Sequence, residues 1–224
     1  ILEDLGPTYI KLGQIMSMRS DMLPKAYCDE LTKLRSDAAP MPFAQVRRAL
    51  EAAYGRPLEQ VFASFEETPL GSASIAQAHR AALATGEQVV VKVQREGIYD
   101  TMSRDMALLR QAARLLKYTG ASEIVDLNMV LDEMWAVAQQ EMDFLQEAAN
   151  LEEFAQFNRD APFIDCPALY REYTTRQVLV MEYIDGPGVD QADDLRSAGC
   201  DMAKLGGELA DNYVKQVVED GFFH

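Results

Sequence analysis

The segment Gln88–Val93 constrains the fold of this chain more than any other, because a lysine interrupts a run of valines. Successive side chains of a β-strand point to opposite faces of a sheet. Alternate valines therefore share one face, and Lys92 shares the other face with Val90. An ammonium group among valines needs an anionic partner, because burying it unpaired costs several kcal/mol. The alternative is an ordinary surface lysine at the end of a strand.

The residues before this strand form a loop of small side chains that leads into a β-hairpin. Gly71–His79 reads Gly-Ser-Ala-Ser-Ile-Ala-Gln-Ala-His, and a turn at Thr85-Gly86-Glu87 separates strands expected at Ile75–Leu83 and Gln88–Val93. Protein kinases hold the phosphates of ATP with such a loop and a lysine on the following strand. Alanine and serine stand here where those enzymes use glycine. This favours an unusual kinase-like fold with altered nucleotide handling.

Helical and strand patterns around the hairpin extend this expectation to the whole chain. Helices are predicted from Pro7, from Pro24 to about Arg35, at Phe43–Tyr54, Tyr99–Tyr118, Leu127–Phe157 and Met202–Glu219, and further strands at Val61–Phe65, Ala168–Tyr173 and Gln177–Ile184. The order predicts an α+β fold: a protein-kinase-like small lobe with an antiparallel sheet and an αC-type helix, an N-terminal helical extension, and the first helices of a large lobe. The expected boundaries are 1–56, 57–186 and 187–224.

The predicted helix Leu127–Phe157 carries carboxylates that could pair with Lys92. Asp143, Glu147 and Asn150 form one row at helical spacing, and Glu141 falls on the apolar stripe of the same helix. Two acidic groups four residues apart destabilise a helix by a few tenths of a kcal/mol unless a cation lies between them. Lys92 or another cation could fill that place; alternatively, the row is a solvated face.

The spacing of Glu141 and Asp143 sets a geometric condition. They are two residues apart, about 200° around a regular helix, so they cannot serve one site unless the helix bends or restarts there. We expect such an irregularity if both are functional. Lys11 and Gln14 share one face of the first helix, and Gly13 between them allows close backbone approach. This short pattern alone is typical of an ordinary amphipathic helix.

Together these motifs resemble the UbiB family, also called ADCK or aarF-domain kinase-like proteins. The resembling segments, which span nearly the whole chain, are Leu5–Gln14 with its K-x-G-Q, Arg19–Pro24, the alanine-rich loop Ser72–His79, Val91-Lys92, Glu141–Phe144 with its E-x-D, and Glu147–Asn150. The resemblance implies an atypical kinase with ATPase activity that supports ubiquinone biosynthesis at membranes.

The resemblance also implies roles for individual residues. Lys92 would bind nucleotide phosphates and pair with Glu147. The loop residues Ser72, Ala73, Ser74, Ile75 and Ala76 would cover the phosphates. Lys11 and Gln14 would lie over the site where a kinase takes its peptide, facing Glu141 and Asp143. Met181 would be the gatekeeper, and the backbone of Glu182 and Ile184 would receive adenine.

Cofactor and catalytic expectations follow from the same resemblance. The cofactor would be ATP or ADP with Mg²⁺. His224 would be the first residue of the catalytic loop, so the catalytic Asp and the metal-binding Asn and Asp are expected beyond it, in a longer protein. No metal ligand is expected within this chain. The chain alone is therefore expected to turn over ATP poorly.

The partners and location are also expectations. The resemblance implies an isoprenoid quinone precursor or quinone-biosynthesis proteins as partners, with peripheral membrane contact, at the inner face of a bacterial membrane or the mitochondrial matrix side. One alternative is a non-catalytic nucleotide-sensing scaffold or lipid-handling chaperone for a quinone-biosynthesis complex. Another is a small-molecule kinase of the aminoglycoside or choline type, which would not be expected to carry K-x-G-Q.

Charge and cysteine content narrow the partner classes. The net charge of −15 argues against nucleic acid, because phosphate backbones are bound by clustered Lys and Arg. The three cysteines form no C-x-x-C pair, which favours a reducing compartment and a cytoplasmic location. The sequence contains no apolar run of about 18 residues that could span a bilayer.

Overall fold

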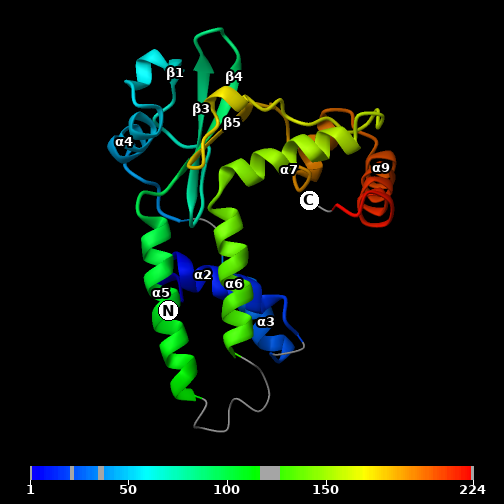
Figure 1. Cartoon of the computed structure of the whole chain (residues 1–224). Helices are drawn as coiled ribbons and strands as arrows, with labels where there is room; N and C mark the ends of the chain where they lie inside the picture. Colours follow the sequence, from blue (N-terminus) through cyan, green and yellow to red (C-terminus); the bar gives the residue numbers. More distant parts are fainter. Residues whose placement is uncertain (1, 21–22, 35–37, 117–126, 223–224) are drawn as a thin grey trace.

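The computed structural model describes residues 2–20, 23–34, 38–116 and 127–222, and it has an antiparallel sheet with helices around it (Figure 1). The helices are α1 (Leu2–Leu5), α2 (Pro7–Ser17), α3 (Lys25–Leu31), α4 (Phe43–Tyr54), α5 (Ile98–Leu116), α6 (Leu127–Glu141), α7 (Phe144–Phe157), α8 (Ala192–Ser197) and α9 (Met202–Lys215). The strands are β1 (Phe62–Phe65), β2 (Gly71–Ser72), β3 (Ala76–Leu83), β4 (Gln88–Gln94) and β5 (Val178–Glu182). This confirms the predicted α+β fold.

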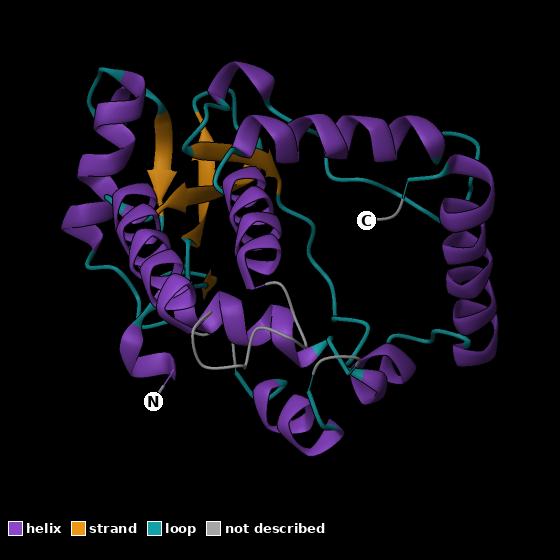
Figure 2. Cartoon of the chain, turned by 60° about the horizontal axis from the view of Figure 1, so that its bottom comes forward, coloured by secondary structure: helices purple, strands orange, loops and turns teal. Residues whose placement is uncertain are grey.

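The sheet places Lys92 at its centre. The strand order is β1-β3-β4-β5, and β2 pairs with β3. Lys92 on β4 therefore has neighbours on both sides, Ala78 on β3 and Leu179 on β5. Figure 2 shows the strands gathered at one end of the molecule, while α7 leads away from them toward α9.

The predicted alternation of β4 is confirmed by the two faces of the sheet. Val89, Val91 and Val93 are buried and belong to the same core cluster as Val46 and Leu50 of α4. Lys92 lies on the opposite face, beneath α7. The sheet is therefore covered on both faces by helices, and the lysine is on the face that α7 covers.

The helix predicted over Leu127–Phe157 is two helices. α6 ends at Glu141, and Asp143 adopts an extended conformation with φ −111° and ψ 95° before α7 begins. The Asp143 carboxylate accepts a hydrogen bond from the backbone N–H of Leu145 at 3.1 Å, which is a helix N-cap. The irregularity expected between Glu141 and Asp143 is present, and its local cause is this cap.

One predicted strand is wrong. Ala168–Tyr173 forms only an isolated bridge from Leu169 to Met181 and then a 3₁₀ turn over Arg171–Tyr173. The physical reason is Thr174, whose hydroxyl donates to the carbonyl of Tyr170 at 3.0 Å and accepts from the N–H of Val180 at 3.2 Å. The Thr174 hydroxyl thus replaces a backbone hydrogen bond between strands. The chain therefore turns here instead of continuing as a strand.

Several boundaries also differ from the sequence-based expectation. The sequence does not predict the short β2 and α8. Helix α9 ends at Lys215, before the predicted Glu219. A π-helical turn at Gln216–Asp220 follows it, and then Gly221 with φ +63°. The expected ends at Arg35 and Tyr118, and the position of His224, lie outside the described residues. The three proposed domain boundaries stay predictions.

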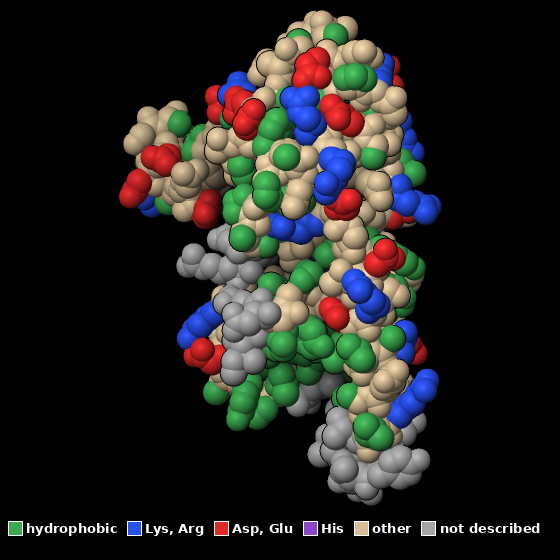
Figure 3. All heavy atoms as spheres, turned by 90° about the vertical axis from the view of Figure 1, so that its left-hand side faces the viewer, with side chains coloured by type: hydrophobic (Ala, Val, Ile, Leu, Met, Phe, Trp, Pro, Cys, Tyr) green, Lys and Arg blue, Asp and Glu red, His purple; other side chains and the backbone are tan. Residues whose placement is uncertain are grey.

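Charged side chains of both signs share the surface of the molecule. On the face shown in Figure 3, Lys and Arg side chains alternate with Asp and Glu side chains. In the part of the chain that the structure describes, no helix has both the length and the apolar character needed to cross a membrane.

A series of buried, hydrogen-bonded polar side chains lies between the sheet and the segment that precedes α4. The side chains of Gln77 and His79 on β3 are almost fully buried. The Nδ1 of His79 lies 2.8 Å from the carbonyl oxygen of Glu66, which can only accept, so Nδ1 carries the proton. Its Nε2 then accepts from the amide of Gln77 at 2.9 Å. The fold thus holds His79 neutral.

Protonation of His79 is expected to destabilise the fold as the pH falls. Burial lowers the pKa of His79 below its usual value of 6.5. Above pH 6.5 the imidazole is neutral whether folded or unfolded and has no effect. Below it the unfolded chain takes up the proton first, so the free energy of unfolding falls as pH drops from about 6.5 through the folded-state pKa. The loss is at most about 1.4 kcal/mol per pH unit.

Urea unfolding at pH 7.5 and pH 5.5 checks this prediction. The wild type should lose stability between these values, and a His79→Gln variant should lose less, because most carboxyl groups titrate below this range. The chain has only one other histidine, His224, so a His224→Gln variant is a matched control. Equal losses in wild type and His79→Gln would contradict the prediction.

Candidate functional site

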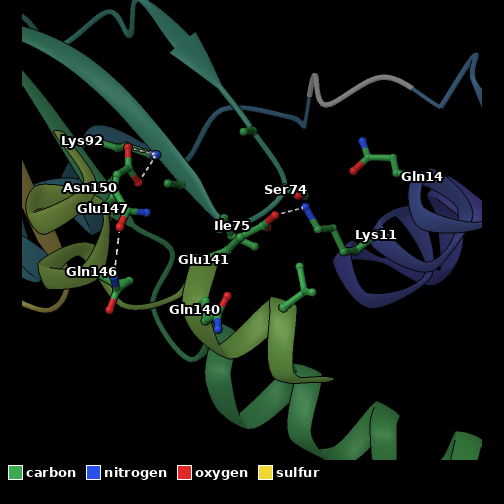
Figure 4. Close-up of a pocket in the computed structure, with 13 residues that line it drawn as sticks. Lys11, Gln14, Ser74, Ile75, Lys92, Gln140, Glu141, Gln146, Glu147 and Asn150 are labelled. Carbon is green, nitrogen blue, oxygen red and sulfur yellow. Dashed lines mark hydrogen bonds and ion pairs between the residues drawn. The ribbon is translucent and has the colours of Figure 1, made fainter. Parts of the chain in front are cut away.

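Nine of the fourteen sequence-predicted site residues line a cavity of about 750 Å³ (Figure 4). It lies between the β2–β3 loop, β4, α2, α6 and α7. Its lining residues are Lys11, Gln14, Ala73, Ser74, Ile75, Ala76, Lys92, Val137, Gln140, Glu141, Gln146, Glu147 and Asn150. The cavity is therefore lined by the helical extension, by the hairpin, and by both α6 and α7, the helices on either side of the break at Asp143.

Lys92 and Glu147 form a two-oxygen ion pair on the wall of this cavity. The Nζ of Lys92 donates to both carboxylate oxygens of Glu147, at 2.8 and 2.7 Å. The two side chains are 29% and 32% exposed, so the pair is open to the cavity while its aliphatic parts are covered. The restart of α7 at Phe144 places Glu147 in the first helical turn, above Lys92. The predicted pairing is present.

The aromatic ring of Phe144 also contacts the lysine of this pair. The Nζ of Lys92 lies 4.9 Å from the ring centroid, within the range of a cation–π interaction. Phe144 is fully buried and packs with Ala76, Ala148 and Leu179. The same side chain therefore anchors α7 on the sheet and positions the lysine.

The alanine-rich loop forms one edge of the cavity. Its tight turn is closed by a hydrogen bond from the N–H of Ala73 to the carbonyl of Ala76, at 2.8 Å. Among the described residues only glycines have positive φ, and no residue of this loop is among them. Alanine and serine are accommodated here because the backbone does not need the conformations that favour glycine.

Ser72 departs from its expected place. Of the five loop residues expected to cover the phosphates, four line the cavity and Ser72 does not. Its hydroxyl accepts from Arg95 at 2.8 Å and donates to Gln77 at 3.3 Å. These partners hold Ser72 on the side of the loop that faces away from the cavity.

Helix α2 meets α6 at the cavity through an ion pair. The Nζ of Lys11 donates to the carboxylate of Glu141, and Gln14 lines the cavity from the same helix face. Gly13 packs closely against the segment that follows α3, since a β-carbon there would collide with the side chain of Leu34. The expected facing of Lys11 and Glu141 is present.

Asp143 does not join this site. It caps α7, and its carboxylate lies 3.3 Å from the Nε of Arg176. The sequence placed it in a row with Glu147, with Lys92 or another cation between them. Because the helix breaks before Asp143, Arg176 pairs with Asp143 while Lys92 pairs with Glu147. Of the E-x-D pair, only Glu141 lines the cavity.

The residues expected to receive adenine also lie outside the cavity lining. Met181 packs against the cluster around Phe144. The N–H of Glu182 donates to the carbonyl of Ala168 at 2.8 Å, and Ile184 is 57% exposed. The cavity thus brings together all the residues assigned to phosphates except Ser72, and the gatekeeper and adenine assignments stay predictions.

Some lining residues escaped the sequence reasoning. Val137, Gln140 and Gln146 carry no motif that marks them, although Gln146 donates to the side chain of Asn150 at 2.9 Å. Helical spacing alone could have flagged Val137 and Gln140, which lie on the same part of α6 as Glu141. Within the described ranges, no group of three or more His, Cys, Asp or Glu side chains is placed to hold a metal ion.

Comparison with known proteins finds relatives that are similar over almost the whole chain. The ABC1 atypical kinase-like domain matches residues 33–224. The chain is 40% identical over 225 residues to "Protein ACTIVITY OF BC1 COMPLEX KINASE 8, chloroplastic" of Arabidopsis thaliana, covering 98% of this chain and 29% of that protein. It is 36% identical over 224 residues to "Probable protein kinase UbiB" of Marinobacter nauticus, covering 100% of this chain and 41% of that protein.

A solved structure is similar as well. The Rv3197–erythromycin complex of Mycobacterium tuberculosis has a TM-score of 0.56 and 32% sequence identity, covering 79% of this chain and 43% of that chain. The chain spans less than half the length of these relatives. The match over residues 33–224 shows that the chain belongs to the ABC1 atypical kinase-like family.

Proposed function

We propose that this chain supplies the lysine side of the nucleotide site in an atypical kinase-like ATPase that supports isoprenoid quinone biosynthesis. The observation that carries the proposal is the two-oxygen Lys92–Glu147 pair on the wall of the cavity. Kinases use a strand lysine paired with a helix glutamate to hold ATP phosphates for transfer. Family membership supports the kinase-like role, and the resemblance to UbiB proteins supports the quinone connection.

The cavity residues fit a nucleotide's phosphates. An ammonium group has three N–H donors, and the Glu147 carboxylate takes two from Lys92, so one remains for a phosphate oxygen. The Glu147 carboxylate keeps Nζ at a fixed place and prevents the lysine from turning away. Ser74 also lines the cavity. Bound ATP would supply the transferable phosphoryl group.

Magnesium would depend on residues outside the described part of the chain. The described residues hold no cluster of three or more side chains suited to a metal ion, and Mg²⁺ bound with ATP would need only one or two carboxylate ligands from the protein besides the phosphates. We propose that these ligands and the catalytic base lie in the rest of a longer polypeptide. We also propose peripheral contact with the inner face of a bacterial membrane or the matrix side of a mitochondrial one.

The experiment that tests the proposal uses the full-length protein. ATP binding is measured by isothermal titration calorimetry, and hydrolysis is measured by phosphate release. The quinone content of cells lacking the gene is then compared with that of cells complemented by it. We expect ATP binding, hydrolysis and restored quinone. Failure to bind ATP would overturn the nucleotide site, and unchanged quinone in the deletion strain would overturn the biosynthetic role.

A second candidate function is a nucleotide-sensing scaffold or lipid-handling chaperone for a quinone-biosynthesis complex. The Lys11–Glu141 ion pair favours it, because this pair holds α2 against the cavity and would limit access of a protein substrate. Full-length protein lacking the catalytic-loop aspartate distinguishes the two. Restored quinone would favour the scaffold, and lost quinone with intact ATP binding would favour phosphoryl transfer or hydrolysis.

A further inference from the structure

We propose that Arg95 is a positioning residue that fastens the β2–β3 loop to the segment between α3 and α4, within the helical extension. The fastened loop segment is 72–75, and the joining segment is 38–41, named here the linker. The inference rests on the proposed function, because it takes this loop as the one that covers the phosphates. Through Arg95, the position of the helical extension would control the position of the loop at the nucleotide site.

The guanidinium of Arg95 contacts both segments at once. Its Nε donates to the carbonyl of Ala73 at 2.9 Å, and its Nη2 donates to the hydroxyl of Ser72 at 2.8 Å. The same Nη2 donates to the carbonyl of Ala39 at 2.8 Å. The backbone N–H of Arg95 also donates to the carbonyl of Ile75, at 2.9 Å. One residue thus contacts three of the four loop residues and the linker.

These contacts are unusual for a partly buried arginine. Among the described residues no carboxylate forms an ion pair with Arg95, and its side-chain donors go to backbone carbonyls and a hydroxyl. Burial lowers the pKa of Arg95, which agrees with a guanidinium enclosed without a countercharge. The planar fork of arginine can reach several acceptors in fixed directions, whereas the single nitrogen of a lysine cannot. Geometry rather than charge neutralisation therefore explains why arginine stands here.

The linker is held against the loop at two further points. The N–H of Ala38 donates to the carbonyl of Ser72 at 3.1 Å. The N–H of Met41 donates to the side-chain oxygen of Gln77 at 2.6 Å, and the same oxygen accepts from Ser72. Arg95, Ser72 and Gln77 thus form one polar connection between the linker and the strands that enclose the loop.

This connection contacts the loop that lines the cavity, and α2 lines the same cavity directly. The extension that carries Lys11 and Gln14 continues through α3 into the linker. A shift of the extension would therefore pull on the carbonyls of the loop through Arg95, as well as moving α2 at the mouth. The position of the helical extension would thus be coupled to the position of the β2–β3 loop.

Nucleotide binding by variants of the full-length protein tests the proposal. Arg95→Ala is expected to weaken ATP binding by about tenfold or more, because a loop displaced by about 1 Å loses its alignment with the phosphates. Adenosine, which has no phosphate, should bind each variant with unchanged affinity. Arg95→Lys, which keeps the charge, should not restore ATP affinity. Arg48→Ala is the matched control, because Arg48 is nearby, 64% exposed and paired with Glu96.

Amide hydrogen exchange in the absence of nucleotide gives an independent readout. Exchange in segment 71–76 is expected to become faster in Arg95→Ala and in Arg95→Lys, and to stay unchanged in Arg48→Ala. Normal ATP affinity in Arg95→Lys, equal losses for ATP and adenosine, or unchanged exchange in 71–76 would each overturn the positioning role. If the wild type bound no ATP, the proposed function would fail, while the exchange measurement would still decide the role of Arg95.

Discussion

Replacing Lys92 with alanine is expected to weaken ATP binding by about 10- to 100-fold. A hydrogen bond to a charged group contributes about 1.5–3 kcal/mol, which corresponds to this range. The variant also leaves the Glu147 carboxylate, which is 32% exposed, facing the phosphates without a cation. Attraction is thus replaced by repulsion. Isothermal titration calorimetry of the full-length protein measures the change, and Lys33→Ala, an exposed lysine on another element, is the matched control.

A second substitution separates the lysine from its partner. Glu147→Gln keeps the size of the side chain and loses the charge, so Lys92 is held less firmly but remains available. We expect a smaller loss of ATP affinity than in Lys92→Ala. In the double variant Lys92→Ala with Glu147→Ala, ATP should bind no more weakly than in Lys92→Ala alone, because the repelling carboxylate is gone. ATP binding of Lys92→Ala equal to wild type would show that the assigned role of Lys92 is wrong.

Regular periodicity placed the two residues of the central pair on suitable faces, and the resemblance to kinase-like proteins supplied their pairing. Strand alternation placed Lys92 opposite the buried valines, and helical spacing placed Glu147 and Asn150 on one face. Both elements are regular at these positions, so local pattern and tertiary structure agree. The K-x-G-Q and E-x-D motifs extended the prediction to Lys11 and Glu141, which the structure brings together.

The parts that could not be predicted depend on side chains that replace backbone hydrogen bonds. Asp143 looks like a member of a continuous helical row until its carboxylate is seen to cap a new helix. Thr174 similarly ends a segment whose composition favours a strand. Arg95 gave no signal, because its acceptors are mainly backbone carbonyls, which every residue carries. Such contacts are visible only when distant segments are placed in space.

Replacing Phe144 with alanine is expected to lower the free energy of unfolding by about 3–5 kcal/mol, the usual cost of removing a buried aromatic side chain. Phe144 is fully buried at the first position of α7, and its backbone N–H donates to the carbonyl of Arg176 at 3.1 Å. Leu145→Ala is the matched control, since Leu145 is adjacent, 37% exposed and expected to change stability far less. Urea unfolding of both variants measures the difference, and similar losses would contradict the prediction.

The variant Phe144→Leu separates packing from the contact with Lys92. Leucine retains most of the apolar volume but has no aromatic face for the ammonium group, which lies 4.9 Å from the ring centroid. A cation–π interaction contributes about 0.5–2 kcal/mol, so loss of its positioning effect on Lys92 should weaken ATP binding by at most about 30-fold. Stability should fall less than in Phe144→Ala. Unchanged ATP affinity in Phe144→Leu would mean that the Glu147 carboxylate alone holds Lys92 in place, and that the ring serves only to anchor α7.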